Sequence, residues 1–316
     1  MQKIIYINDH LSSAEFYDSV LPEIQIVLKY YDKINELIFD FSGTSKVEPN
    51  VIPNFLSLGK VIKSVLGYKA TVRIPDTFKG GKLKNYLYQM KFISLAMESF
   101  IFESDPYTGF DGKPIDPLCG TVYFSQDATD DEIGFVFDNM VNPFADKYLK
   151  KYNKIRLDDG QIENNVVNLL KELAANAKDH GNSYSYTSIH AKYSSHTIFI
   201  AISDSGIGFL KSCIEEHLEE IKKNELDIHD EVAAIMYCIY IRKTSKKFGL
   251  YAVIKDTITF GGTVRIHSNN SQIIFTPRIK EEFENGTLLK DNSFKKYNIK
   301  NDLEFSGAHI ELEIPF

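Results

Sequence analysis

Glu172, Asn176 and Asp179 are spaced to line one stripe of a helix predicted over Leu169–Asn182. At about 100° per residue, positions i, i+4 and i+7 lie above one another. The stripe borders an apolar arc made of Ile162, Val166, Leu169, Leu170, Leu173 and Ala177. A carboxylate, an amide and a second carboxylate at the rim of a core can hold a hard cation such as Mg²⁺ together with a polar ligand.

A further polar side chain, Asp204, follows a run of strand-forming residues. Thr197–Ser203 is apolar on both faces, which predicts a central strand. Gly206 and Gly208 then predict a tight turn whose backbone can approach a ligand closely. Asp204 would therefore be a fixed hydrogen-bond acceptor at the end of the strand, suited to an exocyclic amino group.

Together these segments resemble the GHKL ATPase superfamily. This superfamily contains DNA gyrase B, heat-shock chaperone ATPases, sensor histidine kinases, mismatch-repair ATPases and anti-sigma-factor serine kinases, and the stretch 172–181 is most similar to the last group. The residues that carry the resemblance are Glu172, Asn176, His180, Gly181, Asp204, Gly206, Gly208, Gly249 and Leu250.

The resemblance implies a site for Mg²⁺ and ATP. Glu172 would be the general base that activates water or a hydroxyl group, and Asn176 would bind the Mg²⁺ that bridges the phosphates. Asp204 would accept a hydrogen bond from the adenine amino group. Gly206 and Gly208 would shape the adenine pocket and the start of an ATP lid over 209–248.

The other nucleotide contacts implied are Asp179 and the segment 244–250, which stands at the place of the family's second glycine box. There, backbone N–H groups at a helix N-terminus face the phosphates. The segment departs from the family's Gly-x-Gly-Leu pattern because one glycine is absent. Thr244 is equally consistent with a helix N-cap, and the lysines with solvated charges. The candidate contacts are Thr244, Lys246, Lys247, Gly249 and Leu250.

The predicted fold class is α/β (α+β) with two domains. Residues 151–316 would form a GHKL-type two-layer α/β sandwich, with 261–266 and 306–314 as its closing strands. Residues 103–150 would be a linker with connecting helices, in which the acidic run 127–132 begins a helix.

Residues 1–102 alternate between predicted strands and helices: strands near 1–9, 37–41 and 70–74, and helices over 52–66 and 82–102. This order resembles STAS domains, the fold of anti-sigma-factor antagonists. Such antagonists carry a phosphorylatable serine at the start of the helix after the second of these strands, whereas Val47–Ile52 contains none. We therefore expect a regulatory or docking module; a purely structural α/β domain is the alternative.

Composition limits the classes of partner. The chain has 316 residues, a formal net charge of −7 and three cysteines far apart in the sequence. The negative charge disfavours binding to nucleic acid. The cysteine number disfavours a disulfide framework, and no apolar run reaches the roughly 20 residues that span a bilayer. We expect a cytoplasmic protein with no membrane partner.

Three functions follow as hypotheses. The first hypothesis is an ATPase or a serine/threonine protein kinase of GHKL type, acting on water or on a partner protein. The second reading is a nucleotide-gated interaction module with little turnover, an anti-sigma-like or stress and defence regulator. A regulator that has lost nucleotide binding is the third. The expected partner is a transcription regulator or a STAS-type protein, and a homodimer is a further expectation.

Overall fold

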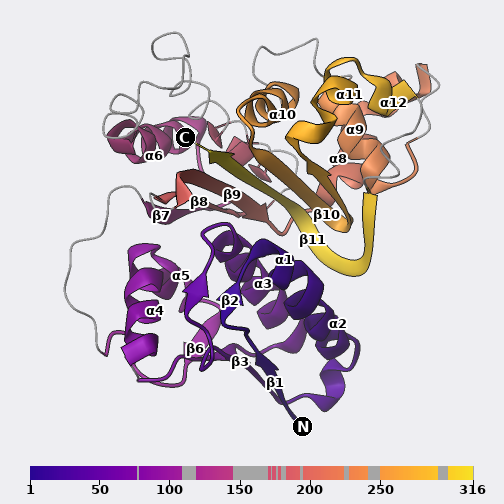
Figure 1. Cartoon of the computed structure of the whole chain (residues 1–316). Helices are drawn as coiled ribbons and strands as arrows, with labels where there is room; N and C mark the ends of the chain where they lie inside the picture. The colour runs from indigo at the N-terminus through magenta and orange to yellow at the C-terminus, as the bar shows by residue number, and fades with distance from the viewer. Residues whose placement is uncertain are drawn as a thin grey trace.

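The computed structural model describes residues 1–76, 78–108, 119–144, 170–171, 173–175, 177–178, 183–192, 195–223, 228–240, 250–290 and 298–315. They form a mixed α/β protein with one parallel and one antiparallel main sheet (Figure 1). The predicted fold class is therefore confirmed in general terms. We call residues 1–108 the N-terminal unit and residues 119–315 the C-terminal unit.

The N-terminal unit is built on a parallel sheet of order β1-β3-β5-β6. Its strands are β1 (Gln2–Tyr6), β3 (Glu36–Asp40), β5 (Ala70–Arg73) and β6 (Phe100–Phe102). A short parallel pair, β2 (His10–Leu11) and β4 (Lys46–Val47), lies beside them. The strands predicted near 1–9, 37–41 and 70–74 are thus present.

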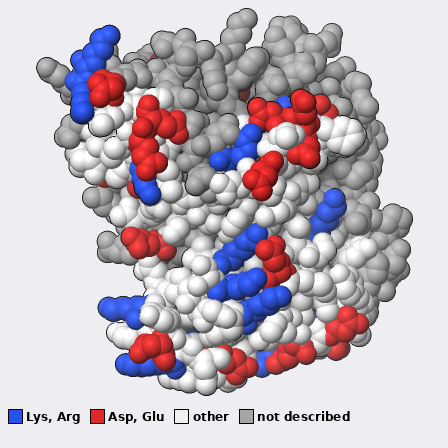
Figure 2. Space-filling view, turned by 180° about the vertical axis from the view of Figure 1, so that it is seen from behind, with Lys and Arg blue, Asp and Glu red and all other residues white. Residues whose placement is uncertain are grey.

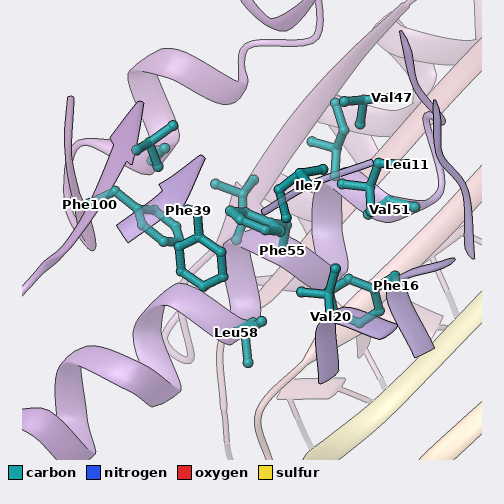
Figure 3. Packing of buried hydrophobic residues seen from close by; sticks show 14 of the residues in the cluster. Ile7, Leu11, Phe16, Val20, Phe39, Val47, Val51, Phe55, Leu58 and Phe100 are labelled. Atoms are coloured by element: carbon teal, nitrogen blue, oxygen red, sulfur yellow. The ribbon is translucent and has the colours of Figure 1, made fainter. Parts of the chain in front are cut away.

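Helices connect these strands, as parallel pairing requires. They are α1 (Ser13–Glu15), η1 (Phe16–Val20), α2 (Leu21–Lys29), η2 (Tyr31–Lys33), α3 (Val51–Leu66), α4 (Phe78–Gln89) and α5 (Phe92–Ala96). Phe55 of α3 packs against Phe39 and Phe100 of the sheet, with ring centroids 4.8 and 5.4 Å away. Figure 3 shows these rings at the centre of the N-terminal core.

The helix predicted over 82–102 is wrong in its length. Lys91 adopts a left-handed conformation with φ of 57°, which separates α4 from α5. The chain then turns into strand β6, which pairs with β5. The apolar residues that suggested one long helix are instead shared between two helices and a strand.

The C-terminal unit contains a five-stranded antiparallel sheet of order β10-β11-β9-β8-β7. Its strands are β7 (Cys119–Phe124), β8 (Ser185–Lys192), β9 (Thr197–Asp204), β10 (Thr263–Phe275) and β11 (Asn298–Pro315). The predicted central strand is confirmed, because β9 lies between β11 and β8. The two predicted closing strands are confirmed as parts of β10 and β11.

The segment predicted as a linker, 103–150, contributes to this sheet and its core. β7 pairs with β8 along its whole length, and α6 (Asp130–Phe144) buries Ile133 and Phe137 in the C-terminal core. The C-terminal unit therefore includes residues from Cys119 onward rather than from 151. The predicted helix start is confirmed, since Thr129 and Glu132 form reciprocal N-terminal hydrogen bonds.

Further helices of the C-terminal unit, among its described residues, pack on one face of its sheet. They are α8 (Gly208–Lys223), α9 (Glu231–Tyr240), α10 (Leu250–Thr259), η6 (Pro277–Ile279), α11 (Lys280–Glu284) and α12 (Thr287–Lys290). The core between them and the sheet includes Ile200, Ile202, Ile235 and Ile254.

Helix α3 lies between the two main sheets. Its residues 51–59 are all buried, and it contacts β8, β9 and β11 as well as the parallel sheet. Figure 1 shows the five-stranded sheet between the N-terminal helices below it and the C-terminal helices above it. The two units are therefore joined face to face, through the face of the five-stranded sheet that its own helices leave uncovered.

The described surface carries both signs of charge. Figure 2 shows lysine and arginine interspersed with aspartate and glutamate on the back face. Within the described ranges, the helices include none that is both long and apolar enough to cross a bilayer.

Candidate functional site

Asp204 ends the central strand β9 and is buried, with 5% of its surface exposed. Its Oδ1 atom accepts hydrogen bonds from the backbone N–H groups of Gly206, at 2.7 Å, and Ala308, at 3.2 Å. Gly206 belongs to the turn after β9, and Ala308 lies in the neighbouring strand β11. The carboxyl group is thus fixed between two backbone segments at one end of the sheet.

Burial is the largest influence on the pKa of Asp204. It raises the pKa of this carboxyl from 3.8 to about 7, while the hydrogen bonds from Gly206 and Ala308 act in the opposite direction. Asp204 therefore changes charge near neutral pH. A carboxyl with this property in a fixed position is characteristic of binding and catalytic sites.

The turn after Asp204 needs a glycine at position 208. Gly208 has a φ of 79°, in the left-handed region. A Cβ atom there would overlap the side-chain amide of Asn269 and lie 2.9 Å from Ser268 Oγ. The predicted glycine turn is therefore present, and β10 closes it from the side.

The strand β11 approaches Asp204 from the other side at Gly307. Gly307 has a φ of 103°, and a Cβ atom there would lie 2.8 Å from Asp204 Oδ1 and closer still to its carbonyl oxygen. This close approach lets the next residue, Ala308, donate its N–H to Asp204. Gly307 thus has the role of a glycine at a close backbone contact.

The start of helix α8 is held by Glu231, the first residue of α9. Glu231 Oε2 accepts hydrogen bonds from the N–H of Leu210, at 3.0 Å, and from Ser268 Oγ, at 2.7 Å. The N–H of Phe209 donates to Ser268 Oγ at 3.0 Å. Helices α8 and α9, which form the first part of the segment predicted as a lid, are therefore tied to strand β10.

The helix predicted over Leu169–Asn182 packs where the sequence pattern predicts. Leu170, Leu173 and Ala174 are helical and buried in the C-terminal core, together with Ile202 of β9, and Ala177 is helical and buried as well. The predicted apolar arc is confirmed at Leu170, Leu173 and Ala177.

Two lysines of the same helix form ion pairs with α6. Lys171 Nζ lies 3.0 Å from Asp138 Oδ1, and Lys178 Nζ lies 2.6 Å from Asp130 Oδ1. Helix α6 is therefore joined to this helix by two ion pairs, in which Asp138 is about half exposed and Asp130 is largely exposed.

Of the predicted site residues, Asp204, Gly206, Gly208 and Leu250 are described. Leu250 is the first described residue of α10 and packs, partly buried, against the same core as β9. The structure therefore brings Leu170, Leu173 and Ala174 to one core with β9 and α10. The predicted residues Glu172, Asn176, Asp179, Thr244, Lys246, Lys247 and Gly249 lie outside the described residues.

Sequence reasoning missed Ala308 of β11, which donates to Asp204, and Asn269 of β10, which holds the segments on either side of it. Asn269 donates to the carbonyl oxygen of Ile207 at 3.2 Å and accepts from the N–H of Gly307 at 3.2 Å. A signal existed in each case: Asn is a residue that tolerates positive φ, and a glycine inside a strand pattern often marks a bulge or a close contact.

The face of the sheet behind this site is polar, although the N-terminal unit covers it. Glu311 Oε1 of β11 accepts a hydrogen bond from Asn54 Nδ2 of α3 at 2.6 Å, and Glu311 Oε2 lies 3.3 Å from Arg265 Nε. The ring of Tyr17 stacks on His267, with centroids 5.0 Å apart. Charged and polar side chains of β10 and β11 thus hold the N-terminal unit.

A second part of this interface is a lysine surrounded by tyrosines. Lys60 Nζ of α3 lies 3.9 Å from the ring centroid of Tyr184, 4.4 Å from that of Tyr123 and 5.6 Å from that of Tyr186. Its side chain is only 13% exposed and forms an ion pair with Glu98 at 3.3 Å. A cation over several ring faces is a favourable contact, so this cluster links the units at the β7–β8 edge.

Comparisons with protein-family models, with characterised proteins and with solved structures gave no match to this chain. Over the described ranges, no group of three or more His, Cys, Asp or Glu residues could hold a metal ion. The residue predicted to bind Mg²⁺, Asn176, lies outside those ranges.

Proposed function

We propose that this protein binds an adenine nucleotide at Asp204 and uses it in signalling or regulation. The observation that carries the proposal is the buried carboxyl of Asp204 at the end of the central strand, held by the turn at Gly206 and by β11 at Ala308. In its ionised form this carboxyl is an acceptor for an exocyclic amino group such as that of adenine. The hydrogen bonds described above all go to Oδ1, so Oδ2 is available to a ligand.

The surrounding fold supports the same proposal. The helix that carries residues 170–178 and the helix α10 share a core with β9. The residues proposed to act on the phosphates belong to these segments or precede them directly: Glu172 as general base, Asn176 as the Mg²⁺ ligand, and Lys246 or Lys247 as phosphate contacts. When bound, Mg²⁺ would neutralise phosphate charge, and Glu172 would take the proton of the attacking hydroxyl or water.

A second candidate function is a nucleotide-gated interaction module, in which binding matters more than turnover. It is favoured by the position of β11. One strand carries both Ala308, which contacts Asp204, and Glu311, which binds Asn54 of the N-terminal unit. A ligand at Asp204 could therefore bias how the N-terminal unit is held. In this role the N-terminal unit would be the regulatory or docking module that its likeness to STAS domains suggests.

Thermal unfolding with and without Mg²⁺ and ATP tests the proposal. A ligand that binds only the folded protein raises its melting temperature by mass action. We expect such a rise for ATP and no rise for GTP at the same concentration. No rise with any adenine nucleotide would contradict the proposal.

ATP turnover distinguishes the two candidate functions. If the protein is an ATPase or a kinase, the wild-type protein releases ADP, or labels a partner protein from labelled ATP, and Glu172→Ala abolishes this activity. If it is a nucleotide-gated module, both proteins bind ATP and neither turns it over. Cytoplasmic location and a homodimeric state remain predictions from the sequence.

A further inference from the structure

We infer that Asn269 is a positioning residue that fixes both backbone segments flanking Asp204, and so sets the shape of the nucleotide base pocket. This inference rests on the proposed function, because it concerns the same pocket. Asn269 lies on β10, at a register irregularity in its pairing with β11. It does not contact Asp204 by any hydrogen bond described here; it acts through the two segments that do.

The side chain of Asn269 uses both ends of its amide. Nδ2 donates to the carbonyl oxygen of Ile207 at 3.2 Å and to Glu231 Oε1 at 2.6 Å. Oδ1 accepts from the N–H of Gly307 at 3.2 Å. One side chain therefore joins the turn after β9, the start of α9 and the bulge of β11.

These contacts bear directly on Asp204. The N–H groups of Gly206 and Ala308 hold Asp204 Oδ1. The two residues that Asn269 contacts are their direct neighbours, since Ile207 follows Gly206 and Gly307 precedes Ala308. If the side chain of Asn269 is removed, the two segments keep the hydrogen bonds that Gly206 and Ala308 donate to Asp204 Oδ1, but lose the link from Ile207 to Gly307. Asp204 would then hold the two segments without this second link, and its carboxyl would be less firmly positioned.

The backbone of Asn269 is adapted to this role. Its φ is 46°, in the left-handed region, which asparagine tolerates better than most residues with a side chain. Its carbonyl oxygen accepts a hydrogen bond from His267 Nε2 at 2.8 Å. Few residues other than asparagine combine this backbone conformation with a donor and an acceptor at the required positions.

Glycine is the substitution that isolates the side chain, because Asn269→Gly keeps a residue that adopts positive φ without strain. The matched control is Asn270→Gly on the same strand, since Asn270 is exposed and its side chain accepts a hydrogen bond only from its neighbour, Ser271 Oγ, at 3.1 Å. The second variant is Asn269→Asp, which keeps the acceptor for Gly307 but has no donor for Ile207.

Two measurements test the inference. Hydrogen exchange of the nucleotide-free proteins should show faster exchange at the amides of Gly307 and residues 206–210 in Asn269→Gly than in Asn270→Gly. Isothermal titration should show an ATP dissociation constant at least about tenfold higher in Asn269→Gly, and a smaller preference for ATP over GTP. Asn269→Asp should lose affinity in the same direction.

The outcomes separate the inference from the proposed function. If wild-type protein binds ATP and Asn269→Gly binds it with the same affinity and base preference, the positioning role is wrong. If the variant only lowers the melting temperature, without changing the base preference of the folded protein, its role is structural and the inference also fails. If the wild-type protein binds no adenine nucleotide, the proposed function itself fails, whatever the exchange data show.

Discussion

Replacing Glu311 by glutamine should make the protein progressively more stable than wild type as the pH rises. Glu311 is only 3% exposed. Burial, the largest influence, raises the pKa of its carboxyl from 4.5 to about 7, although Arg265 beside it acts in the opposite direction. The folded protein therefore keeps a proton that the unfolded chain releases. Stability from this group is fully present below the unfolded pKa and is lost as the pH rises through the folded pKa.

The size of the effect follows from the two pKa values. One pKa unit corresponds to ~1.4 kcal/mol, so the loss for Glu311 amounts to about 3 kcal/mol between acidic and slightly alkaline pH. Glutamine does not ionise and has no such loss. At low pH the variant should differ from wild type by the changed contacts of this side chain with Asn54, Arg265 and Tyr17, where a typical hydrogen bond is worth about 1 kcal/mol.

Urea denaturation of both proteins at several pH values from about 4.5 to about 8 measures this difference. The free energy of unfolding of Glu311→Gln minus that of wild type should increase by about 3 kcal/mol over this range. The buried histidines of β10 and β11, whose pKa values burial lowers, and Asp204 are present in both proteins, so their titration largely cancels. Glu304→Gln on the same strand is the control, because Glu304 is exposed. A difference that stays constant within ~0.5 kcal/mol would refute the assignment of Glu311 as a buried, pH-dependent group.

Three further predictions concern the site and the interface. Gly307→Ala should lower the free energy of unfolding, measured by urea denaturation, by clearly more than Gly286→Ala. Both glycines have positive φ, which costs a residue with a side chain about 1–2 kcal/mol, but only the Cβ at Gly307 would overlap the backbone of Asp204. Equal losses in the two variants would show that the close approach is absent. Lys60→Met should cost roughly 1–2 kcal/mol of stability by removing the cation from the three tyrosine rings. Lys63→Met on the same helix, where the lysine is exposed, should cost little, and equal losses would contradict the packing at Lys60. Adenosine, which has no phosphate to titrate, should bind more weakly as the pH falls below about 7, by up to tenfold per pH unit. The reason is that the pKa of Asp204 is about 7 and that the ionised carboxyl is the acceptor. If titration calorimetry finds an adenosine affinity that does not change with pH, Asp204 is excluded as the contact.

Local sequence patterns were enough to predict the central strand and the turn that follows it. Strand β9 is apolar on both faces because helices cover one face and the N-terminal unit covers the other. The turn at Gly206 and Gly208 could be foreseen because the glycines are adjacent to the strand. The apolar spacing at Leu170, Leu173 and Ala177 likewise predicted a buried helix face, since helical periodicity is a local property.

The contacts that complete the environment of Asp204 could not be predicted in this way. Asn269 and Ala308 are 65 and 104 positions further along the chain, and only the pairing of β9, β11 and β10 brings them to Asp204. Residues 306–314 were predicted only as a closing strand, and the local pattern does not show that α3 covers Glu311, which is buried.

Two elements were misjudged for a related reason. Strand β6 has only three residues and follows two helices, so its apolar side chains extended the helical pattern. Strand β7 lies in a segment that was read as a linker, and it is recognised as a strand only by its pairing with β8. Short edge strands depend on their neighbours for stability, so their own sequence is a weak signal.

The central claim, that Asp204 contacts an adenine base, is tested most directly by titrating ATP into wild-type protein and Asp204→Asn in the presence of Mg²⁺. Asparagine keeps the size of the side chain but replaces one acceptor oxygen by a donor, which opposes an amino group. We predict that wild-type protein binds ATP and that Asp204→Asn, still folded, binds it at least about tenfold more weakly. Equal affinities in the two proteins, or no binding by wild type, would contradict the claim.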